Sequence, residues 1–146
     1  MTGPAGIPAP RASRPTGVRQ VALAAGRDLD RTLAFWQDCL GLHVHARYEP
    51  PGIAFILIDG VRMFFSDGLP AGTVYLDMPG LDDFVALALE SGAAFTALPA
   101  RVHVDHEGQF GAAGEEEWMA FLKDPAGNTI GLVERRPATG TTPEAA

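Results

Sequence analysis

The sequence lacks several features that stabilise or anchor proteins in place of a hydrophobic core. Cys39 is the single cysteine among 146 residues, so one chain cannot form a disulfide framework or a cysteine-based zinc site. No apolar run is long enough to span a bilayer, and residues 1–17 contain no apolar segment of the kind that a secretory signal requires. We therefore expect a cytoplasmic protein with no membrane partner.

Positive charge is also scarce. The chain has 11 basic and 18 acidic residues, which gives a net charge of −7, and the basic residues form no stripe. Affinity for nucleic acid comes largely from neutralising phosphates with Lys and Arg, so the sequence argues against a nucleic-acid partner. The surplus of acidic residues is typical of a surface that keeps a protein in solution.

What the sequence does contain is enough apolar material for one domain. Hydrophobic residues make up 47% of the chain, and its length is typical of a single compact unit. The two ends depart from this composition, because residues 1–16 and 137–146 are rich in Pro, Gly, Ala and Thr. Such segments bury too little apolar surface to offset the entropy of ordering. We expect disordered tails there and a folded domain over residues 17–136.

The folded region contains the same order of elements twice. A strand-like run precedes a helix that Asp28 caps, and three extended segments follow it. The same order returns after residue 73, with a strand, a helix over 81–92 and three more extended segments. Short local matches, such as "GVRMFF" with "GNTIGL", indicate an internal duplication. The sequence therefore predicts an α+β fold of two βαβββ modules, at about 18–66 and 73–134.

Side chains along most of these strands alternate between an apolar face and a mixed face. We expect the apolar face, which includes Ala46, to lie under the helices. If the duplicated sheet curves, its mixed face lines a cup for a small ligand; if it stays flat, that face meets solvent. The segments 52–58 and 117–123 are apolar on both sides, so alternation does not orient them. The mixed face includes Gln20, His43, His45, Arg62, Phe64, Thr73, Tyr75, Asp77 and Gly131.

Three stretches carry a resemblance to a known family: "RQVALAAGRDLDRTLAFWQDCLGL", "GIAFILIDGVRMFF" and "EEEWMAFLKDPAGNTIGLVE". Over about residues 18–135 the sequence resembles the vicinal oxygen chelate superfamily, which includes glyoxalase I, extradiol dioxygenases and bleomycin-resistance proteins. The resemblance implies two βαβββ modules that form a cupped mixed sheet with helices on its outer face. It also implies a homodimer whose cup binds a small molecule.

Metal-dependent members of that superfamily place four His, Glu or Gln ligands on the first and last strands of the modules. The matching positions here are Gln20, Phe64, Thr73 and Gly131, and only Gln20 is of a usual ligand type. A divalent ion needs several donors to replace its water, so we expect no metal and no cofactor at this place. A relocated metal site stays open at two places: the pair His43 and His45, and the group His103, Asp105, His106 and Glu107.

The cup leaves three functions open. In the first, it binds a small, aromatic or drug-like ligand without reaction, with aromatic stacking and with Arg62 clamping a carboxylate or phosphate. In the second, a metal-independent isomerase, lyase or cyclase uses His43, His45 and Asp77 as acid–base groups. In the third, the protein is a metalloenzyme with relocated ligands, and in each case the glycine-rich segment 103–116 can act as a lid. The residues expected to contact the ligand are Gln20, Arg62, Phe64, Thr73, Tyr75, His103 and Trp118.

Overall fold

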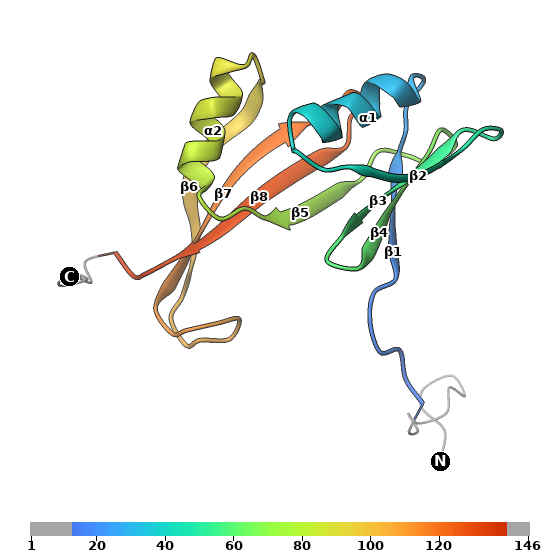
Figure 1. The fold of residues 1–146 in the computed structure, drawn as a ribbon. Coiled ribbons are helices and arrows are strands. Elements are labelled where there is room, and N and C mark those ends of the chain that lie inside the picture. Colours follow the sequence, from blue (N-terminus) through green and yellow to red (C-terminus); the bar gives the residue numbers. More distant parts are fainter. Residues whose placement is uncertain (1–12, 140–146) are drawn as a thin grey trace.

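The computed structural model describes residues 13–139, and its elements follow the predicted order of strand, helix and three strands, twice (Figure 1). The expected tails, 1–16 and 137–146, lie mostly outside the described residues. Within residues 13–139, neither helix is long and apolar enough to cross a membrane. The first module consists of β1 (Gln20–Ala24), α1 (Leu29–Asp38), β2 (Val44–Tyr48), β3 (Ile53–Ile58) and β4 (Val61–Ser66), and the second of β5 (Thr73–Asp77), α2 (Leu81–Glu90), β6 (Phe95–Asp105), β7 (Glu115–Lys123) and β8 (Thr129–Arg136).

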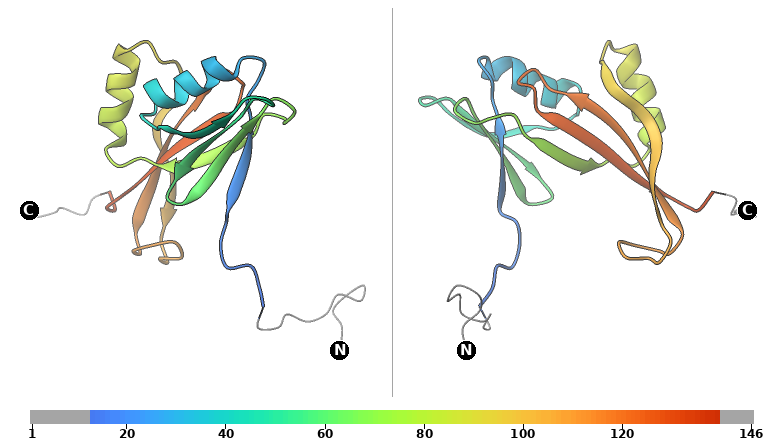
Figure 2. Two further views of the ribbon diagram at one scale, coloured as in Figure 1. Left: turned by 45° about the vertical axis from the view of Figure 1, so that its right-hand side comes forward. Right: turned by 180° about the vertical axis from the view of Figure 1, so that it is seen from behind.

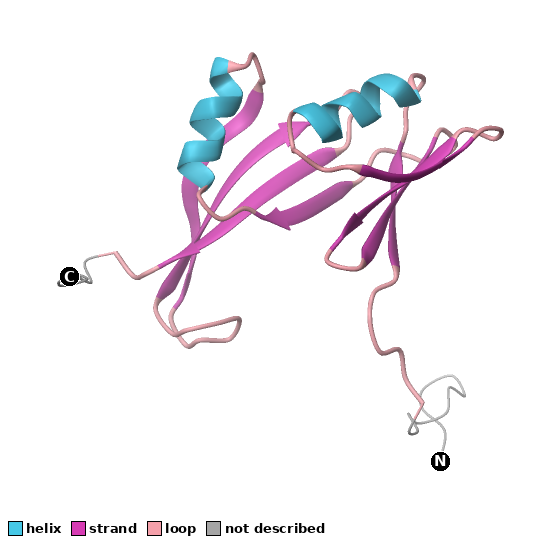
Figure 3. Cartoon of the chain, in the orientation of Figure 1, coloured by secondary structure: helices cyan, strands magenta, loops and turns pink. Residues whose placement is uncertain are grey.

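Each module forms a four-stranded mixed sheet, with the order β1-β4-β3-β2 in the first and β5-β8-β7-β6 in the second. The first and last strands of a module pair in parallel, and the remaining pairs are antiparallel. Both helices lie on the same side of the sheets (Figure 3), and the views in Figure 2 show no helix of the described chain on the other side. We name that helix-free side the inner face. The predicted α+β fold of two βαβββ modules is confirmed.

The two helices begin in different ways. The Asp28 carboxylate accepts a hydrogen bond from the Arg31 N–H at 3.0 Å, as expected for a residue that caps a first turn. Helix α2 has no side-chain cap of this local kind. Its N-cap residue, Gly80, has a φ of 71° and donates its N–H to Glu134 Oε2 at 2.8 Å. Strand β8 therefore supplies the acceptor that satisfies the start of α2, from 54 residues along the chain.

The core lies between the helices and the helix-facing side of the strands. Trp36 of α1 and Phe65 of β4 are completely buried and meet edge to face, with ring centroids 5.2 Å apart. Buried residues of β1, β4 and β8, such as Leu23 and Leu132, occupy the positions that the alternation predicted. Burying these side chains supplies the main favourable contribution to folding.

Strand β2 departs from the predicted alternation. A register shift between Val44 and Ala46 inserts one residue, so Ala46 lies opposite Phe55 and faces the inner side of the sheet. The prediction that Ala46 lies under the helices is therefore wrong. Arg47 turns to the helix-facing side instead, where its guanidinium pairs with Asp30 of α1. A bulge of this kind reverses the parity of every residue that follows it.

The turn of the DPxGN motif joins the two modules. Asn128 is buried, and its Oδ1 accepts hydrogen bonds from the N–H groups of Ala24 at 3.1 Å and Gly72 at 2.9 Å. Its Nδ2 donates to the carbonyl of Ala24 at 2.7 Å and to Asp124 Oδ2 at 2.8 Å. Asp124 in turn accepts a hydrogen bond from Trp36 Nε1 at 2.9 Å. One side chain thus connects the first strand, the entry to β5 and the last hairpin.

Candidate functional site

Aromatic rings cover much of the inner face of the first module. Phe55 and Phe64 lie opposite each other on β3 and β4, and their rings stack with centroids 5.2 Å apart and planes 26° apart. Tyr48 of β2 meets Phe55 edge-on at 6.1 Å, and the guanidinium carbon of Arg62 lies 5.7 Å from the centre of the Phe55 ring. These contacts form a broad apolar surface with a cation at its edge.

The second module carries its own pair of rings on the inner face. Tyr75 of β5 and Phe121 of β7 meet edge to face at 5.9 Å, above Gly131 of β8. A Cβ at Gly131 would lie 2.6 Å from Cδ2 of Tyr75 and 2.9 Å from Cε1 of Phe121, so any larger residue would have to displace these rings. We name the five rings the aromatic row: Tyr48, Phe55, Phe64, Tyr75 and Phe121.

A hollow of about 550 Å³ on the inner face of the first module is lined by Tyr48 and Phe55 of the aromatic row. The β2 bulge brings both His45 and Ala46 to its wall, and Leu57 adds apolar surface. Two guanidinium-bearing residues, Arg19 and Arg62, complete its polar part. We name this cavity the first-module hollow.

The four positions that match metal ligands lie on the helix-free side of their sheets, and none of them lines the first-module hollow. Gln20 lies opposite Arg62, and Thr73 is on the same side of β5 as Tyr75. Their donors do not fit a divalent ion, because Phe64 carries no donor and the rings of Tyr75 and Phe121 occupy the space above Gly131. Within residues 13–139, no three His, Cys, Asp or Glu side chains gather as a metal-binding group, including those suggested for a relocated site.

The candidate acid–base residues lie apart. His43 precedes β2 and is exposed, His45 lines the first-module hollow, and Asp77 ends β5 in the other module. Among the described residues, no hydrogen bond or ion pair joins any two of them. The structure therefore brings only His45 to a cavity.

Two further candidates occupy opposite faces of the second sheet. His103 lies opposite Glu117 on β7, on the inner face but near the far end of the sheet. Trp118 lies on the helix-facing side, where its Nε1 donates to Glu116 at 2.8 Å and Arg136 covers its ring at 4.4 Å. Trp118 thus packs against the core instead of lining the cup.

The far end of the inner face is built around Arg135. Its guanidinium pairs with three carboxylates: Glu115 at 2.8 Å, Glu117 at 2.9 Å and Asp105 at 3.0 Å. The hydrogen bond that Arg135 donates to Glu115 contributes most to its raised pKa, and those that it donates to Asp105 and Glu117 act in the same direction. The carboxylates on this part of the inner face are thus already held by a cation.

Asp105 also ties down the loop between β6 and β7. Its carboxylate is buried and accepts hydrogen bonds from the N–H groups of Phe110 at 2.9 Å and Gln109 at 2.8 Å. The Phe110 N–H, followed by Gln109 and Arg135, lowers the pKa of Asp105 to about 2 against the opposing effect of burial. The start of this loop is therefore fixed to the sheet, and closure of the segment 103–116 as a lid stays a prediction.

Comparison with known proteins identifies the fold. No family model and no curated protein matches the sequence. A lactoylglutathione lyase from Agrobacterium tumefaciens matches with a TM-score of 0.65 and 17% identity, over 84% of this chain and 96% of that one. TnmS3, an antibiotic-binding protein from Streptomyces sp. CB03234, matches with a TM-score of 0.65 and 17% identity, over 85% of this chain and 99% of that one. A glyoxalase/bleomycin resistance protein/dioxygenase from Nocardioides matches with a TM-score of 0.63 and 18% identity, over 91% and 90%. This chain has the vicinal oxygen chelate fold.

Several residues of the site in this vicinal oxygen chelate fold were not among the sequence candidates. Phe55 belongs to a strand that alternation does not orient, but the Asp59–Gly60 turn fixes the register of this strand against β4. A two-residue turn sets Ile58 opposite Val61, and counting back places Phe55 opposite Phe64. No comparable signal in the sequence reveals Tyr48 or Arg19. A bulge changes the face on which Tyr48 lies, and Arg19 precedes β1.

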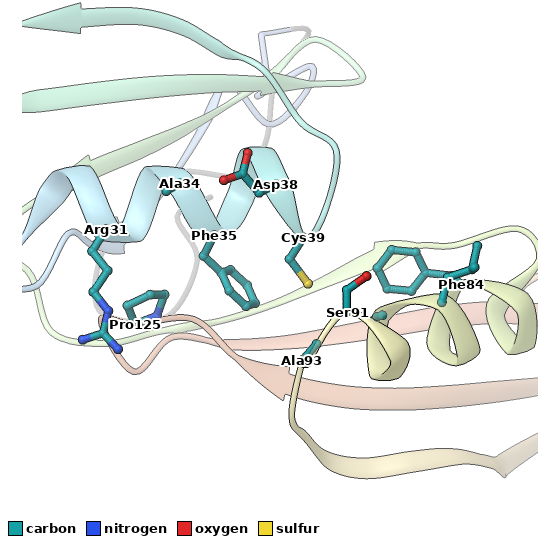
Figure 4. A pocket seen from close by; sticks show the side chains of 12 residues that line it. Arg31, Ala34, Phe35, Asp38, Cys39, Phe84, Ser91, Ala93 and Pro125 are labelled. Atoms are coloured by element: carbon teal, nitrogen blue, oxygen red, sulfur yellow. The ribbon is translucent and has the colours of Figure 1, made fainter.

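A second hollow lies on the helix-covered side, between α1 and α2, with a volume of about 670 Å³. Figure 4 shows the Phe35 ring and the Cys39 thiol directed into it, with Arg31 and Pro125 at one end. Burial raises the pKa of the Cys39 thiol, which favours its protonated form. We name this the interhelical cleft. No ring of the aromatic row lines the interhelical cleft. Substitutions in this cleft can therefore serve as controls for substitutions on the inner face.

Proposed function

We propose that this protein binds a small molecule with a flat aromatic part on its inner face and releases it unchanged. The aromatic row is the observation that carries the proposal. Phe64 is half-buried, and Tyr48 and Tyr75 keep 55% and 57% of their surface exposed, so these rings are available to a ligand while Trp36 and Phe65 are not. Large exposed rings at the edge of a cavity are typical of ligand sites.

One observation at Gly131 supports binding without a metal in the familiar place. The rings over Gly131 occupy the place where a metal ligand would project. One structural neighbour, TnmS3, is named as an antibiotic-binding protein. A metal-independent enzyme that uses His45 in the first-module hollow is the alternative.

A ligand screen tests the proposal. We expect planar aromatic compounds to raise the melting temperature of the purified protein equally with and without added Mn²⁺ or Zn²⁺, because a ligand that binds only the folded state stabilises it. For a hit, Phe64→Leu should weaken binding roughly 3–10-fold, since it removes one stacking ring. Phe84→Leu, which alters the interhelical cleft in the same way, should leave the affinity unchanged.

Three results would contradict the proposal. Conversion of the bound compound to a product by the purified protein would show an enzyme. A shift that appears only with added metal would show a metal-dependent site. Loss of affinity in Phe84→Leu but not in Phe64→Leu would move the ligand to the interhelical cleft.

Two expectations from the sequence stay predictions. The resemblance implies a homodimer, and sedimentation equilibrium should give twice the mass of one chain if that is so. A cytoplasmic location follows from the composition of the chain and is tested by fractionating cells that express it.

A further inference from the structure

We infer that the ligand of the inner face is an aromatic oxyanion, whose charged group binds at Arg62 and Arg19 in the first-module hollow while its ring lies on the aromatic row. This inference rests on the proposed function and adds the chemical class of the ligand. Carboxylate and phosphate offer the same paired oxygens to a guanidinium, so either group fits the recognition argued below.

Arg62 is placed for this role by its strand and its neighbour ring. It lies opposite Leu57 on β3, and its guanidinium carbon is 5.7 Å from the centre of the Phe55 ring, which also stacks with Phe64. A ligand ring that packs beside Phe55 would therefore hold its substituent close to a cation. Geometry of this kind binds a ring and a charge together.

The guanidinium of Arg62 has no carboxylate partner among the described residues. Four other arginines of the described chain have one, namely Arg47, Arg101, Arg135 and Arg136, whereas Arg14, Arg27 and Arg31 do not. Arg19 likewise forms no ion pair within the described chain. Two cations thus meet at one cavity without an internal counter-ion.

The charge around the first-module hollow is the reverse of the charge of the whole chain. The protein carries 18 acidic and 11 basic residues, yet no Asp or Glu of the described chain lines this hollow. Acidic side chains of the inner face, including Glu115 and Glu117, lie in the second module and pair with Arg135. A local positive site in an acidic protein attracts an anion to one place, because the remaining acidic surface of the protein repels it.

The size of the cavity also suits such a ligand. Its volume of about 550 Å³ lies within the roughly 300–1,000 Å³ of typical small-molecule sites, which accommodates a fused aromatic ring with its acidic group. Leu57 and Phe55 give the apolar wall, and the guanidinium groups give the polar one. His45 at the same wall offers a further hydrogen bond to an oxyanion.

Matched probes that share one ring test the inference. Binding of 2-naphthoate, 2-naphthyl phosphate and the neutral 2-naphthamide is measured by amide NMR titration of the full chain, which detects millimolar affinities. We expect at least one anion to bind roughly 3–10-fold tighter than the amide, because a charged hydrogen bond at a partly exposed site contributes modestly. In 0.5 M NaCl this preference should shrink, because salt screens exposed charges.

Substitutions locate the charge recognition. Arg62→Gln should abolish the preference for the anion while the affinity for 2-naphthamide stays within about twofold, and Arg19→Gln should reduce the preference. Arg31→Gln removes the same charge from the interhelical cleft and should leave the affinities for all three probes unchanged. Unchanged melting temperatures of the variants would show that folding is intact.

Three other outcomes would contradict either the anion preference, its place in the first-module hollow, or the proposed function itself. Equal binding of the amide and both anions, still weakened by Phe64→Leu, refutes the inference and leaves the proposed function standing. Loss of the preference in Arg31→Gln but not in Arg62→Gln refutes the placement in the first-module hollow. No binding of any probe refutes both the inference and an aromatic-binding inner face.

Discussion

Gly131 and Phe64 occupy equivalent places in the two modules, yet one is the smallest residue and the other among the largest. The neighbouring first strands compensate, because Ala22 lies opposite Phe64 while Tyr75 lies opposite Gly131. Each module therefore keeps one large ring in this row of the sheet, on β4 in the first and on β5 in the second. The exchange preserves an apolar inner surface and leaves no room for a coordinating side chain at Gly131.

Gly131→Ala tests this residue-scale account. The added Cβ would overlap the Tyr75 and Phe121 rings, so we expect a loss of stability of about 1–3 kcal/mol, the usual cost of overfilling a packed site. Combining it with Tyr75→Ala should cost less than the sum of the two single changes, measured as free energies of unfolding in urea. Strict additivity in this double-mutant cycle would show that the Tyr75 ring does not limit the space at Gly131.

At the scale of elements, polar side chains set the position of segments that hydrophobic contacts leave free. Glu134 of β8 accepts the N–H of Gly80, the N-cap residue of α2, and Asp105 at the end of β6 holds the loop that leads to β7. Arg135 of β8 connects that loop to the neighbouring strand. The start of a helix and the base of a loop therefore depend on β8, the strand that pairs with both β5 and β7.

Asp105 gives an element-scale prediction on pH. Its pKa is about 2 in the folded protein and 3.8 in its ordinary state, so the folded form holds the proton less readily. The stabilisation from Asp105 is present above about pH 4 and is lost as the pH falls toward 2. We expect Asp105→Asn to melt below the wild type at pH 7, with the difference narrowing between pH 4 and pH 2.

Hydrogen exchange gives a second measurement on the same variant. The amides of Gln109 and Phe110 should exchange faster in Asp105→Asn at pH 7, because their acceptor loses its charge. A constant difference in melting temperature from pH 7 to pH 2, with unchanged exchange at these two amides, would contradict the role given to Asp105.

At the scale of the whole molecule, the two modules share an apolar core and a small polar junction but no sheet. The two four-stranded sheets are separate in their hydrogen-bond ladders. Asn128 bridges them through Ala24 and Gly72, and the carbonyl of Gly72 accepts a further hydrogen bond from the Thr129 N–H at 2.8 Å. Because rings on the inner face come from both modules, a change at this junction would move the two sets of rings relative to each other.

Asn128→Ala is expected to lower the free energy of unfolding by roughly 2–4 kcal/mol, because it leaves the buried polar groups of Ala24 and Gly72 without partners. Asn128→Asp should also destabilise, since it loses the donor to Ala24 and places a carboxylate beside Asp124. Gln37→Ala, which removes an exposed amide hydrogen bond to Val44, should change stability by less than about 0.5 kcal/mol. Equal effects of Asn128→Ala and Gln37→Ala in chemical denaturation would refute the junction.

The order of elements, the duplication and most of the strand faces were determined by the sequence alone. Local chemistry is sufficient for these features: Asp28 caps a helix, the Asp59–Gly60 turn sets a hairpin, and period-two alternation sorts side chains by face. The predicted inner-face positions of Gln20, Phe64, Thr73 and Gly131 follow from the same alternation and agree with the strand register.

Only the tertiary structure decided which of these residues meet. The bulge in β2 adds one residue without a sequence signal, and it moves Ala46 and Tyr48 onto the inner face. Trp118 lies on the helix-facing side because its strand packs under α2, which a segment apolar on both faces does not reveal. The convergence of Arg19 and Arg62 on one hollow likewise depends on contacts between separate strands. Alternation specifies the face of a residue, whereas the packing of strands and helices specifies its neighbours.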